Sequence, residues 1–294
     1  MDYLLQQLIN ASALGGTYAL LALGLAVVFS ILGLINFAHG ELMTVTGYGL
    51  VFALGVGFGY IPALVCGVIL AVVVALSMER IAFRPVRKAS ATTMLLTSFA
   101  VSSILHTGFQ NFISARPVAV PVPDWMGRSL SFGLLEIGVI PLISIITTAG
   151  ALVLLIWFFQ RTYFGLAMRA AAADFSIARL MGIKANQVIA AAFAISGFLA
   201  SLAGLLWLFQ RGSVDPMLGF VPVLKAFIAA VLGGLGSLEG AVLGGFILGF
   251  IEVMLRGYLP DSLLGFRDAI SLSLVVAILV FFPNGLLGKQ IEAR

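Results

Sequence analysis

Long uninterrupted runs of apolar residues constrain this chain more than any other feature. Runs such as 11–32, 135–159 and 188–209 match the length of about 20 residues that a helix needs to cross a hydrocarbon core about 30 Å thick. Of the 294 residues, 61% are hydrophobic and 10% are charged. A soluble domain devotes about a quarter of its residues to charged side chains. The composition therefore excludes a soluble fold and predicts a polytopic integral membrane protein.

Nine candidate spans follow from these runs, at 11–32, 40–56, 59–78, 93–112, 135–159, 188–209, 222–236, 238–256 and 269–283. Only a few residues separate 40–56 from 59–78 and 222–236 from 238–256, so one member of each pair could be a broken or re-entrant segment. No basic region precedes the first run, and we expect a retained span there. We predict an all-α integral membrane protein with about eight to ten transmembrane helices, forming a single transmembrane domain over residues 1–294.

The basic residues predict the orientation of the spans. One loop holds Arg80, Arg84, Arg87 and Lys88, another holds Arg161, Arg169, Arg179 and Lys184, and Lys289 and Arg294 end the chain. The loops between these mix basic and acidic residues. Because cytoplasmic loops carry the excess of Lys and Arg, we expect the basic loops and the C-terminus to be cytoplasmic. Nine crossings then place the N-terminus outside, and a tenth would move only the N-terminus.

Two loops are long enough to have structure of their own. Prolines in the outside loop, 113–134, disfavour helix. The inside loop, 160–187, contains an alanine run followed by Phe175, Ala178 and Met181 at helical spacing, with Gly182 as a helix C-cap. This pattern predicts a short helix with an apolar stripe and basic flanks. Such a helix either docks on a partner protein or lies on the lipid surface.

Three polar residues, Asn36, His39 and Glu41, lie at the junction of the first two spans, where polar groups are costly unless they are paired or hydrated. They could ligate a metal or relay protons. Alternatively, Asn36 and Glu41 cap helix ends and His39 lies in a loop. Because no second histidine is nearby in the sequence, the structural role is favoured over the metal site.

Glycines recur at regular spacing near the C-terminal third of the chain. Gly236, Gly240 and Gly244 follow one another every four residues, and so do Gly245 and Gly249. Such spacing favours close packing of helix backbones. Glycine pairs also occur where transporter helices break beside a substrate path, and we take Gly233, Gly234 and Gly236 as candidates for such a break.

Ionisable residues and missing motifs narrow the function further. Lys225, Glu239 and Glu252 lie within or beside spans, and any of them that is buried is a candidate functional residue. The single cysteine, Cys66, lies in an apolar run and is expected to serve packing, since no disulfide or multi-cysteine metal site is possible. The phosphate-binding pattern G-x-x-x-x-G-K-[ST] is absent from the sequence. This chain therefore cannot hydrolyse ATP by itself.

Three motifs resemble one transporter family. Asn36-Phe-Ala-His-Gly-Glu-Leu-Met43, with Gly47-Tyr48 after it, is similar to the N-terminal signature of the permease subunits of branched-chain amino acid ABC transporters. Leu224-Lys-Ala-Phe-Ile-Ala-Ala-Val-Leu-Gly-Gly-Leu-Gly-Ser237 and Phe282-Pro-Asn-Gly-Leu-Leu-Gly288 resemble later motifs of the same family. The motifs occur in the family's order, and the resemblance runs from about residue 5 to residue 290, essentially the whole chain.

The resemblance implies a permease of the bacterial inner membrane that imports amino acids by alternating access. It implies a second permease subunit, commonly a related chain, two ATP-binding subunits that use ATP and Mg²⁺, and a periplasmic substrate-binding protein. No cofactor, metal or nucleic acid is implied for this chain. The cytoplasmic coupling loop 160–187 would dock on the ATPase through Ala170, Ala171, Asp174, Phe175, Ala178, Met181 and Gly182. Asn36, His39, Glu41, Gly233, Gly234 and Gly236 would line the translocation path.

Other functions stay open at this point. Permeases resembling this type also serve urea, short amides and aromatic acids. An ion-coupled carrier could use Asn36, His39, Glu41 and Glu252 without any ATPase. An intramembrane enzyme with Glu41 and His39 as an acid–base pair is disfavoured, because the sequence offers no further catalytic group.

Overall fold

The computed structural model describes residues 2–132 and 135–288. In these ranges each of the nine expected spans contains an α-helix. The helices are α1 (Asp2–Leu32), α2 (Glu41–Gly55), α3 (Tyr60–Met78), α5 (Ala91–Phe112), α6 (Val139–Arg161), α9 (Ala185–Arg211), α10 (Phe220–Gly233), α11 (Leu238–Tyr258) and α12 (Arg267–Phe281). The chain is therefore an all-α membrane protein, as predicted.

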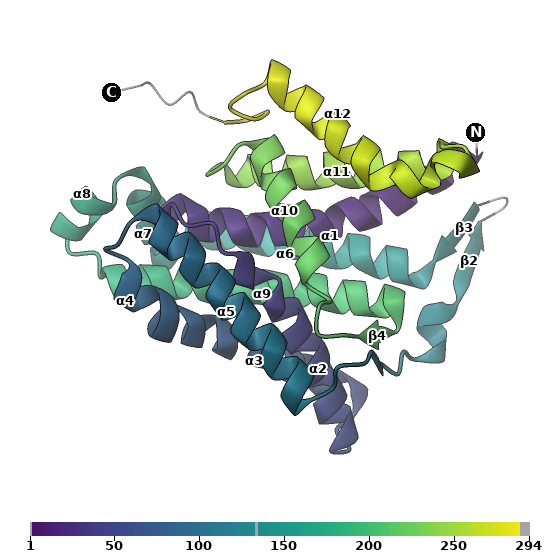
Figure 1. Cartoon of the computed structure of the whole chain (residues 1–294), viewed down its shortest axis with the longest axis horizontal. Helices are drawn as coiled ribbons and strands as arrows, with labels where there is room; N and C mark the ends of the chain where they lie inside the picture. Colours follow the sequence, from purple (N-terminus) through teal and green to yellow (C-terminus); the bar gives the residue numbers. More distant parts are fainter. Residues whose placement is uncertain (1, 133–134, 289–294) are drawn as a thin grey trace.

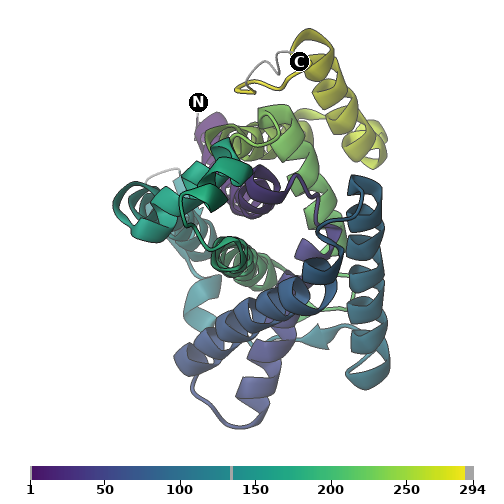
Figure 2. The same ribbon diagram turned by 90° about the vertical axis from the view of Figure 1, so that its left-hand side faces the viewer.

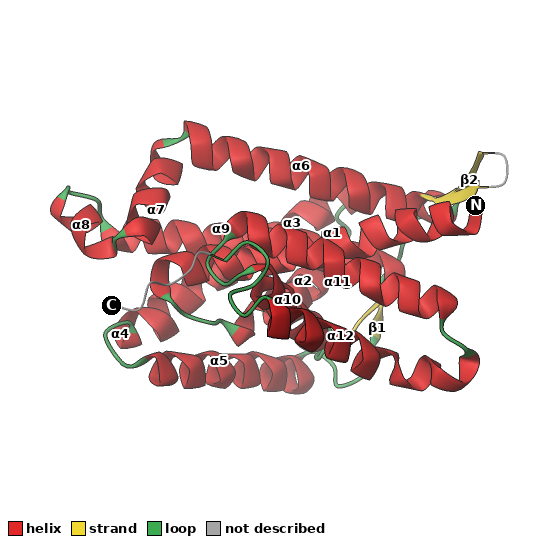
Figure 3. Cartoon of the chain, turned by 90° about the horizontal axis from the view of Figure 1, so that it is seen from above, coloured by secondary structure: helices red, strands yellow, loops and turns green. Residues whose placement is uncertain are grey.

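Shorter elements connect these helices. They are the 3₁₀ turns η1 (Phe37–His39), η3 (Asp124–Gly127) and η4 (Asp261–Phe266), the π-helical turn η2 (Glu79–Phe83), and the short helices α4 (Arg84–Val86), α7 (Tyr163–Ala173) and α8 (Phe175–Leu180). The strands β1 (Val118–Ala119) and β4 (Ser213–Val214) pair with each other, and β2 (Ser129–Phe132) pairs with β3 (Leu135–Gly138), both antiparallel. Helices dominate the molecule, as Figure 3 shows.

The helices differ in how far they can span a bilayer. Among the described residues, six helical segments are long and apolar enough to cross it. The α2 and α10 helices have 15 and 14 residues, so each rises only about 21–23 Å at 1.5 Å per residue. In Figure 1 both lie near the middle of the bundle, with α10 rising beside α11 and α2 descending beside α3 on the opposite side. The expectation that some spans are short or broken is thus confirmed.

The bundle has two distinct ends. Figure 1 shows α4, α7 and α8 at one end, here called the α8 end, and the start of α1, the β2–β3 hairpin and η4 at the other, here called the N-terminal end. At the α8 end, the Arg87 side chain donates to Asn186 at 2.8 Å and pairs with Glu79 at 3.0 Å. The two basic loops of the sequence therefore meet on one side of the molecule, as expected.

The α1 helix forms the centre of the fold. It packs against α6, α9, α10 and α11, and 83% of its most apolar 18-residue stretch is buried. Only 11% of the corresponding stretch in Asp261–Phe281 is buried, and α12 contacts only α10, α11 and η4 extensively. Figure 2, which views the molecule from its α8 end, shows α5 and α12 at the rim. The apolar outer faces of the rim helices are suited to lipid or to another subunit.

The repeated glycines of α11 bring three helices into backbone contact. On one face of α11, a Cβ added at Gly240 or Gly244 would collide with backbone atoms of α10, at Gly233 and Ala229. On another face, a Cβ at Gly245 or Gly249 would collide with the α1 backbone. The two glycine series in the sequence thus serve two different neighbours, and the packing interpretation is confirmed.

Three local differences from the sequence-based expectation have simple causes. Residues 135–138 form strand β3 instead of helix, because Gly138 is extended (φ −62°, ψ 145°) and caps α6. The α1 helix begins at Asp2 instead of residue 11, because residues 2–10, a mixture of polar and apolar side chains, continue the helix beyond the apolar run. Cys66 lies on the exposed face of α3, so its expected packing role is wrong: an all-apolar helix does not show in its sequence which face is inside.

Replacing Gly245 with alanine should lower the stability of the fold. The new methyl group would overlap the backbone of Ala19 on α1, and over-packing of this kind costs about 1–3 kcal/mol. Gly150→Ala on α6 is the matched control, because nothing lies within 4 Å of a Cβ there. We expect thermal unfolding in mild detergent to begin at a lower temperature for Gly245→Ala only. Equal unfolding of both variants would contradict the packing role.

Candidate functional site

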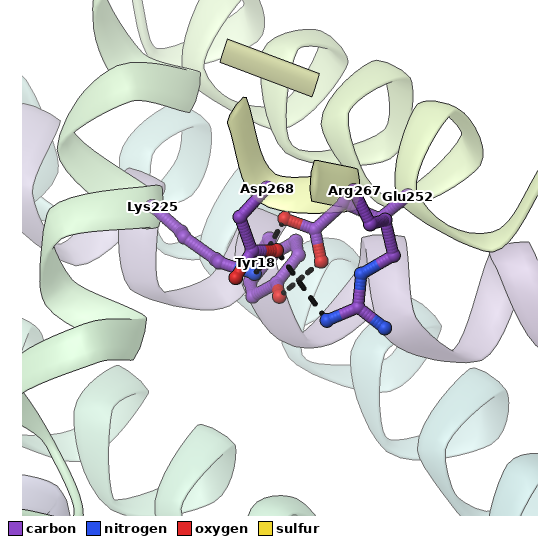
Figure 4. Close-up of polar contacts among 5 residues, drawn as sticks. All are labelled: Tyr18, Lys225, Glu252, Arg267 and Asp268. Atoms are coloured by element: carbon purple, nitrogen blue, oxygen red, sulfur yellow. Dashed lines mark hydrogen bonds and ion pairs between the residues drawn. The ribbon is translucent and has the colours of Figure 1, made fainter. Parts of the chain in front are cut away.

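Five side chains from four helices form an ionic cluster near the N-terminal end of the bundle (Figure 4). Lys225 of α10 pairs with Glu252 of α11 at 2.7 Å and with Asp268 of α12 at 3.4 Å. Arg267 pairs with Asp268 at 3.3 Å. The Tyr18 hydroxyl of α1 donates to the second oxygen of Glu252 at 2.9 Å. We call Tyr18, Lys225, Glu252, Arg267 and Asp268 the ionic cluster.

The ionic cluster has a buried part, Lys225 and Glu252, and an exposed part at Asp268. The side chains of Lys225 and Glu252 are 16% and 7% exposed, whereas that of Asp268 is 59% exposed. An isolated charge at this depth would be costly, but here each buried charge has an opposite partner. Of the three ionisable residues that the sequence places within or beside spans, Lys225 and Glu252 are therefore largely buried. The third, Glu239, lies exposed at the start of α11.

A cavity of about 490 Å³ lies against the ionic cluster. Its charged lining includes Lys225, Glu252, Arg267 and Asp268, together with Arg211 and Arg256 at the last turns of α9 and α11. The rest of the wall is largely apolar, with Leu14, Trp207, Leu218, Val221, Pro222 and Val253. The cavity thus combines converging charged groups with an apolar wall, and its size is within the range of small-molecule sites.

The three polar residues at the α1–α2 junction do not converge on one point. Asn36 caps η1 by accepting from the Ala38 amide at 3.1 Å. His39 Nδ1 shares a hydrogen bond of 2.9 Å with Ser196 of α9. Glu41 accepts from Ser102 of α5 at 2.9 Å. No group of three or more potential ligands is gathered for a metal anywhere in residues 2–132 and 135–288.

His39 is wedged between two helices. It is fully buried, and a Cβ added at Gly24 of α1 would come within 2.6 Å of its ring. Next to it, Phe37 stacks on Phe99 of α5 at 4.5 Å and contacts Phe227 of α10 at 5.6 Å. The junction therefore holds α1, α5, α9 and α10 together. Whether the translocation path also passes here stays a prediction.

The break at Gly233–Gly236 is a packed turn between α10 and α11. Gly234 and Gly236 have φ of 111° and 88°, values that favour glycine. The amides of Leu286 and Leu287 donate to the carbonyls of Leu232 and Gly233, both at 2.9 Å. The last family-like motif of the chain thus closes over this turn. Its role in a substrate path likewise stays a prediction.

The inside loop forms two helices, α7 and α8, where the sequence suggested one. Asp174 separates them: its backbone is extended, and its side chain accepts from the Ile177 amide at 2.9 Å, capping α8. At the other end Gly182, with φ 85°, and the bonds Ile183 N to Ala178 O and Gly182 N to Arg179 O form a Schellman motif. The predicted C-cap at Gly182 is confirmed.

The tip of α8 presents apolar side chains to the outside of the bundle. Leu180 and Met181 are 86% and 79% exposed, and the tip projects from the α8 end (Figure 1). Of the residues proposed for coupling, Ala171 and Ala178 are buried and Ala170 and Phe175 are half-buried. Asp174, Met181 and Gly182 are exposed. A contact through this segment would therefore involve its exposed tip more than its alanines.

Comparisons with known proteins agree with the motifs. The family model described as "Branched-chain amino acid transport system / permease component" matches residues 7–283. The permease LivH of Escherichia coli K12, named for high-affinity branched-chain amino acid transport, is 36% identical over 98% of this chain and 96% of its own length. The chain belongs to the branched-chain amino acid ABC permease family. BraD of Pseudomonas aeruginosa is similar too, at 33% identity over 97% of this chain and 96% of its own length.

As a branched-chain permease family member, the chain is a multi-pass membrane protein and a component of a transporter complex with other subunits. Each motif that suggested the family occupies a junction in the fold. The first forms η1 and the start of α2, the second forms α10 and its terminal turn, and the third closes over that turn. All three motifs therefore meet in space, because Phe37 of the first contacts Phe227 of the second at 5.6 Å, and the third closes over the end of the second although about 45 residues separate these two in the sequence.

Three residues of the ionic cluster were not expected from the sequence: Tyr18, Arg267 and Asp268. Arg267 and Asp268 directly precede the last apolar run and were assigned to an outer loop, whereas they form the first turn of α12. Tyr18 lies inside the first apolar run with no distinguishing neighbour. The sequence signal that could have indicated this site is the pair of adjacent charges, Arg267 and Asp268, at the start of a span.

Removing one charge of the buried pair Lys225–Glu252 should lower the stability of the protein. Removing both charges should restore part of the lost stability. Lys225→Met and Glu252→Gln each leave one buried charge short of its partner, which costs up to about 3–5 kcal/mol. We expect a smaller loss in the double variant than the sum of the two, measured by thermal unfolding in detergent. Glu239→Gln, the same change at the exposed end of α11, should have little effect. Additive losses would contradict the pairing.

Proposed function

We propose that this chain is the transmembrane permease subunit of a binding-protein-dependent ABC importer for branched-chain amino acids. The observation that carries the proposal is similarity along almost the whole chain to permeases named for this transport, LivH and BraD. The single transmembrane domain, residues 1–294, includes the cytoplasmic coupling loop 160–187. The α8 end and the C-terminus face the cytoplasm, and the protein resides in the bacterial inner membrane.

The charge distribution supports this orientation. The basic residues of α4, α7 and α8 gather at the α8 end, and the mixed-charge loops with β1 and β4 lie at the N-terminal end. Since positive loops remain in the cytoplasm, the cavity beside the ionic cluster opens toward the periplasm. That is the side on which a substrate-binding protein delivers its ligand.

The exposed tip of α8 supports contact with an ATPase. Two ATP-binding subunits, which bind ATP and Mg²⁺, associate with two permease subunits, and the α7–α8 segment transmits their closure. Exposed apolar side chains on a capped, basic-flanked helix suit a groove in a partner protein. The motion then alternates access to a path between the two ends of the bundle. The second permease is a related chain, since the family's systems commonly pair two different permeases.

Reconstituted transport tests the proposal. Proteoliposomes that contain the chain with its co-purified subunits should import leucine only with internal ATP–Mg²⁺ and a loaded binding protein. Because ATP hydrolysis supplies the energy, a protonophore should leave the uptake unchanged. Uptake driven by an ion gradient without ATPase subunits would instead support a secondary carrier. ATP-dependent import of urea, amides or aromatic acids, with leucine refused, would reassign the substrate.

The α8 tip should be required for ATPase binding. Leu180→Asp together with Met181→Asp places charges on the exposed apolar tip but keeps the Asp174 cap and the Gly182 turn. We expect the tagged variant to retain the second permease but lose the ATPase in a pull-down from gently solubilised membranes. The control, Ile113→Asp, alters a residue that is 53% exposed just after α5. Retention of the ATPase by the double variant would refute the coupling role.

A further inference from the structure

The outer side of the ionic cluster is poorly suited to contact with the hydrocarbon of a bilayer. Asp268 is 59% and Arg267 33% exposed, although both belong to a helical segment otherwise apolar enough to span a bilayer. A charge exposed to hydrocarbon costs at least about 2.5 kcal/mol. This face of α12 is therefore turned toward water or toward another polar surface. The adjoining cavity is thus a polar entrance in the wall of the bundle.

The charges in this entrance are arranged in alternation. Lys225 lies between two carboxylates, Glu252 and Asp268, and Asp268 lies between two cations, Lys225 and Arg267. The longer contacts of Asp268, at 3.4 and 3.3 Å, are weaker than the 2.7 Å pair of Lys225 with Glu252. Because Asp268 is 59% exposed, water screens its side of both pairs, and solvent-exposed pairs contribute at most about 1 kcal/mol. Asp268 and Arg267 can therefore exchange partners at low cost.

A zwitterion matches this alternation. An α-ammonium group can occupy the place of a cation beside Asp268, while an α-carboxylate takes the place of an anion beside Arg267 or Lys225. Both charges of the ligand are then paired, whereas a ligand with one charge leaves one protein group without a partner. Unpaired charges in a partly desolvated site are costly. The site would thus prefer zwitterions over singly charged analogues of equal shape.

The rest of the cavity suits an aliphatic side chain. Trp207, Leu218, Val221 and Val253 line it beside the charges. Burial of an aliphatic side chain against such a wall contributes about 1.5–3 kcal/mol when complete. The cavity wall therefore offers both charged and apolar groups, the two kinds of group found in an amino acid with a branched aliphatic side chain.

We propose that the cavity beside the ionic cluster binds the ammonium and carboxylate groups of an aliphatic α-amino acid on its way through the permease. This inference rests on the proposed function and adds to it a location and a recognition chemistry. The ionic cluster recognises the part that all α-amino acids share. Selection among side chains can then remain with the binding protein, and the permease needs only a general apolar wall.

Protection of an introduced thiol tests the site without relying on transport. Val221 lines the cavity and is 53% exposed, so Val221→Cys should react with a membrane-impermeant methanethiosulfonate in the purified complex. Cys66→Ser removes the native thiol, the single cysteine of the chain. We expect labelling to slow about tenfold when L-leucine reaches roughly ten times its dissociation constant. The singly charged analogues 4-methylpentanoate and 3-methylbutylamine should protect far less.

Charge variants connect the protection to the ionic cluster. Asp268→Asn alters an exposed side chain and Arg267→Gln a half-buried one. Both variants should fold, and each should raise the leucine concentration needed for protection about tenfold. Glu239→Gln is the matched control on α11, outside the cavity, and should leave it unchanged. Equal protection by the singly charged analogues, or unchanged protection in Asp268→Asn, would overturn the proposal.

The thiol-protection and transport experiments together distinguish a failure of this inference from a failure of the proposed function. ATP-driven leucine import by the unmodified complex, with no protection of Val221→Cys by leucine, would show that the importer is correctly assigned and the site is wrong. Protection by leucine in a complex that imports no leucine with ATP would support the site and overturn the importer assignment.

Discussion

Close contact of the α1, α10 and α11 backbones determines where the charges of this bundle meet. Glycines on two faces of α11 allow both neighbours to approach to backbone distance, and contacts of this kind drive helix association where lipid competes for apolar surface. Tyr18 lies one turn beyond Gly15, which touches Gly249. Side chains on a helix tilt toward its N-terminus, and the Tyr18 hydroxyl thereby reaches Glu252. A wider spacing would leave the Glu252 carboxylate short of a partner.

The main features of the fold could be predicted from the sequence because they depend on local patterns. The apolar runs predicted the spans, the basic loops predicted which segments share an end, and the two glycine series predicted close packing. Asn36, His39 and Glu41 show the limit of such inference. They are neighbours in the sequence, but the turn η1 directs Asn36 to its own backbone, His39 to α9 and Glu41 to α5. Sequence proximity at a helix junction does not imply a common site.

The ionic cluster could not be predicted because its residues are far apart in the sequence and meet only in the folded protein. Its members are spread from Tyr18 to Asp268 over four helices, and no spacing rule relates them. Composition could identify Lys225 and Glu252 as costly in an apolar environment, but it could not pair them, because the pairing depends on how α10 packs on α11. Asp174 is a similar case on a smaller scale. Its capping of α8 divides the inside segment into two helices, which helical periodicity alone does not show.

The walls of the cavity differ in how freely they can move. Lys225 and Glu252 are carried by α10 and α11, whose backbones touch at Gly233, Gly240 and Gly244, and the terminal turn of α10 is held by residues 286–287. By contrast, α12 is largely exposed and has few neighbours, and elements with few buried contacts move at the lowest cost. Arg267 and Asp268 therefore form the half of the ionic cluster that can move at the lower cost. A ligand that bridges Lys225 and Asp268 would tie α12 to α10, so that occupation of the cavity and the position of α12 are coupled.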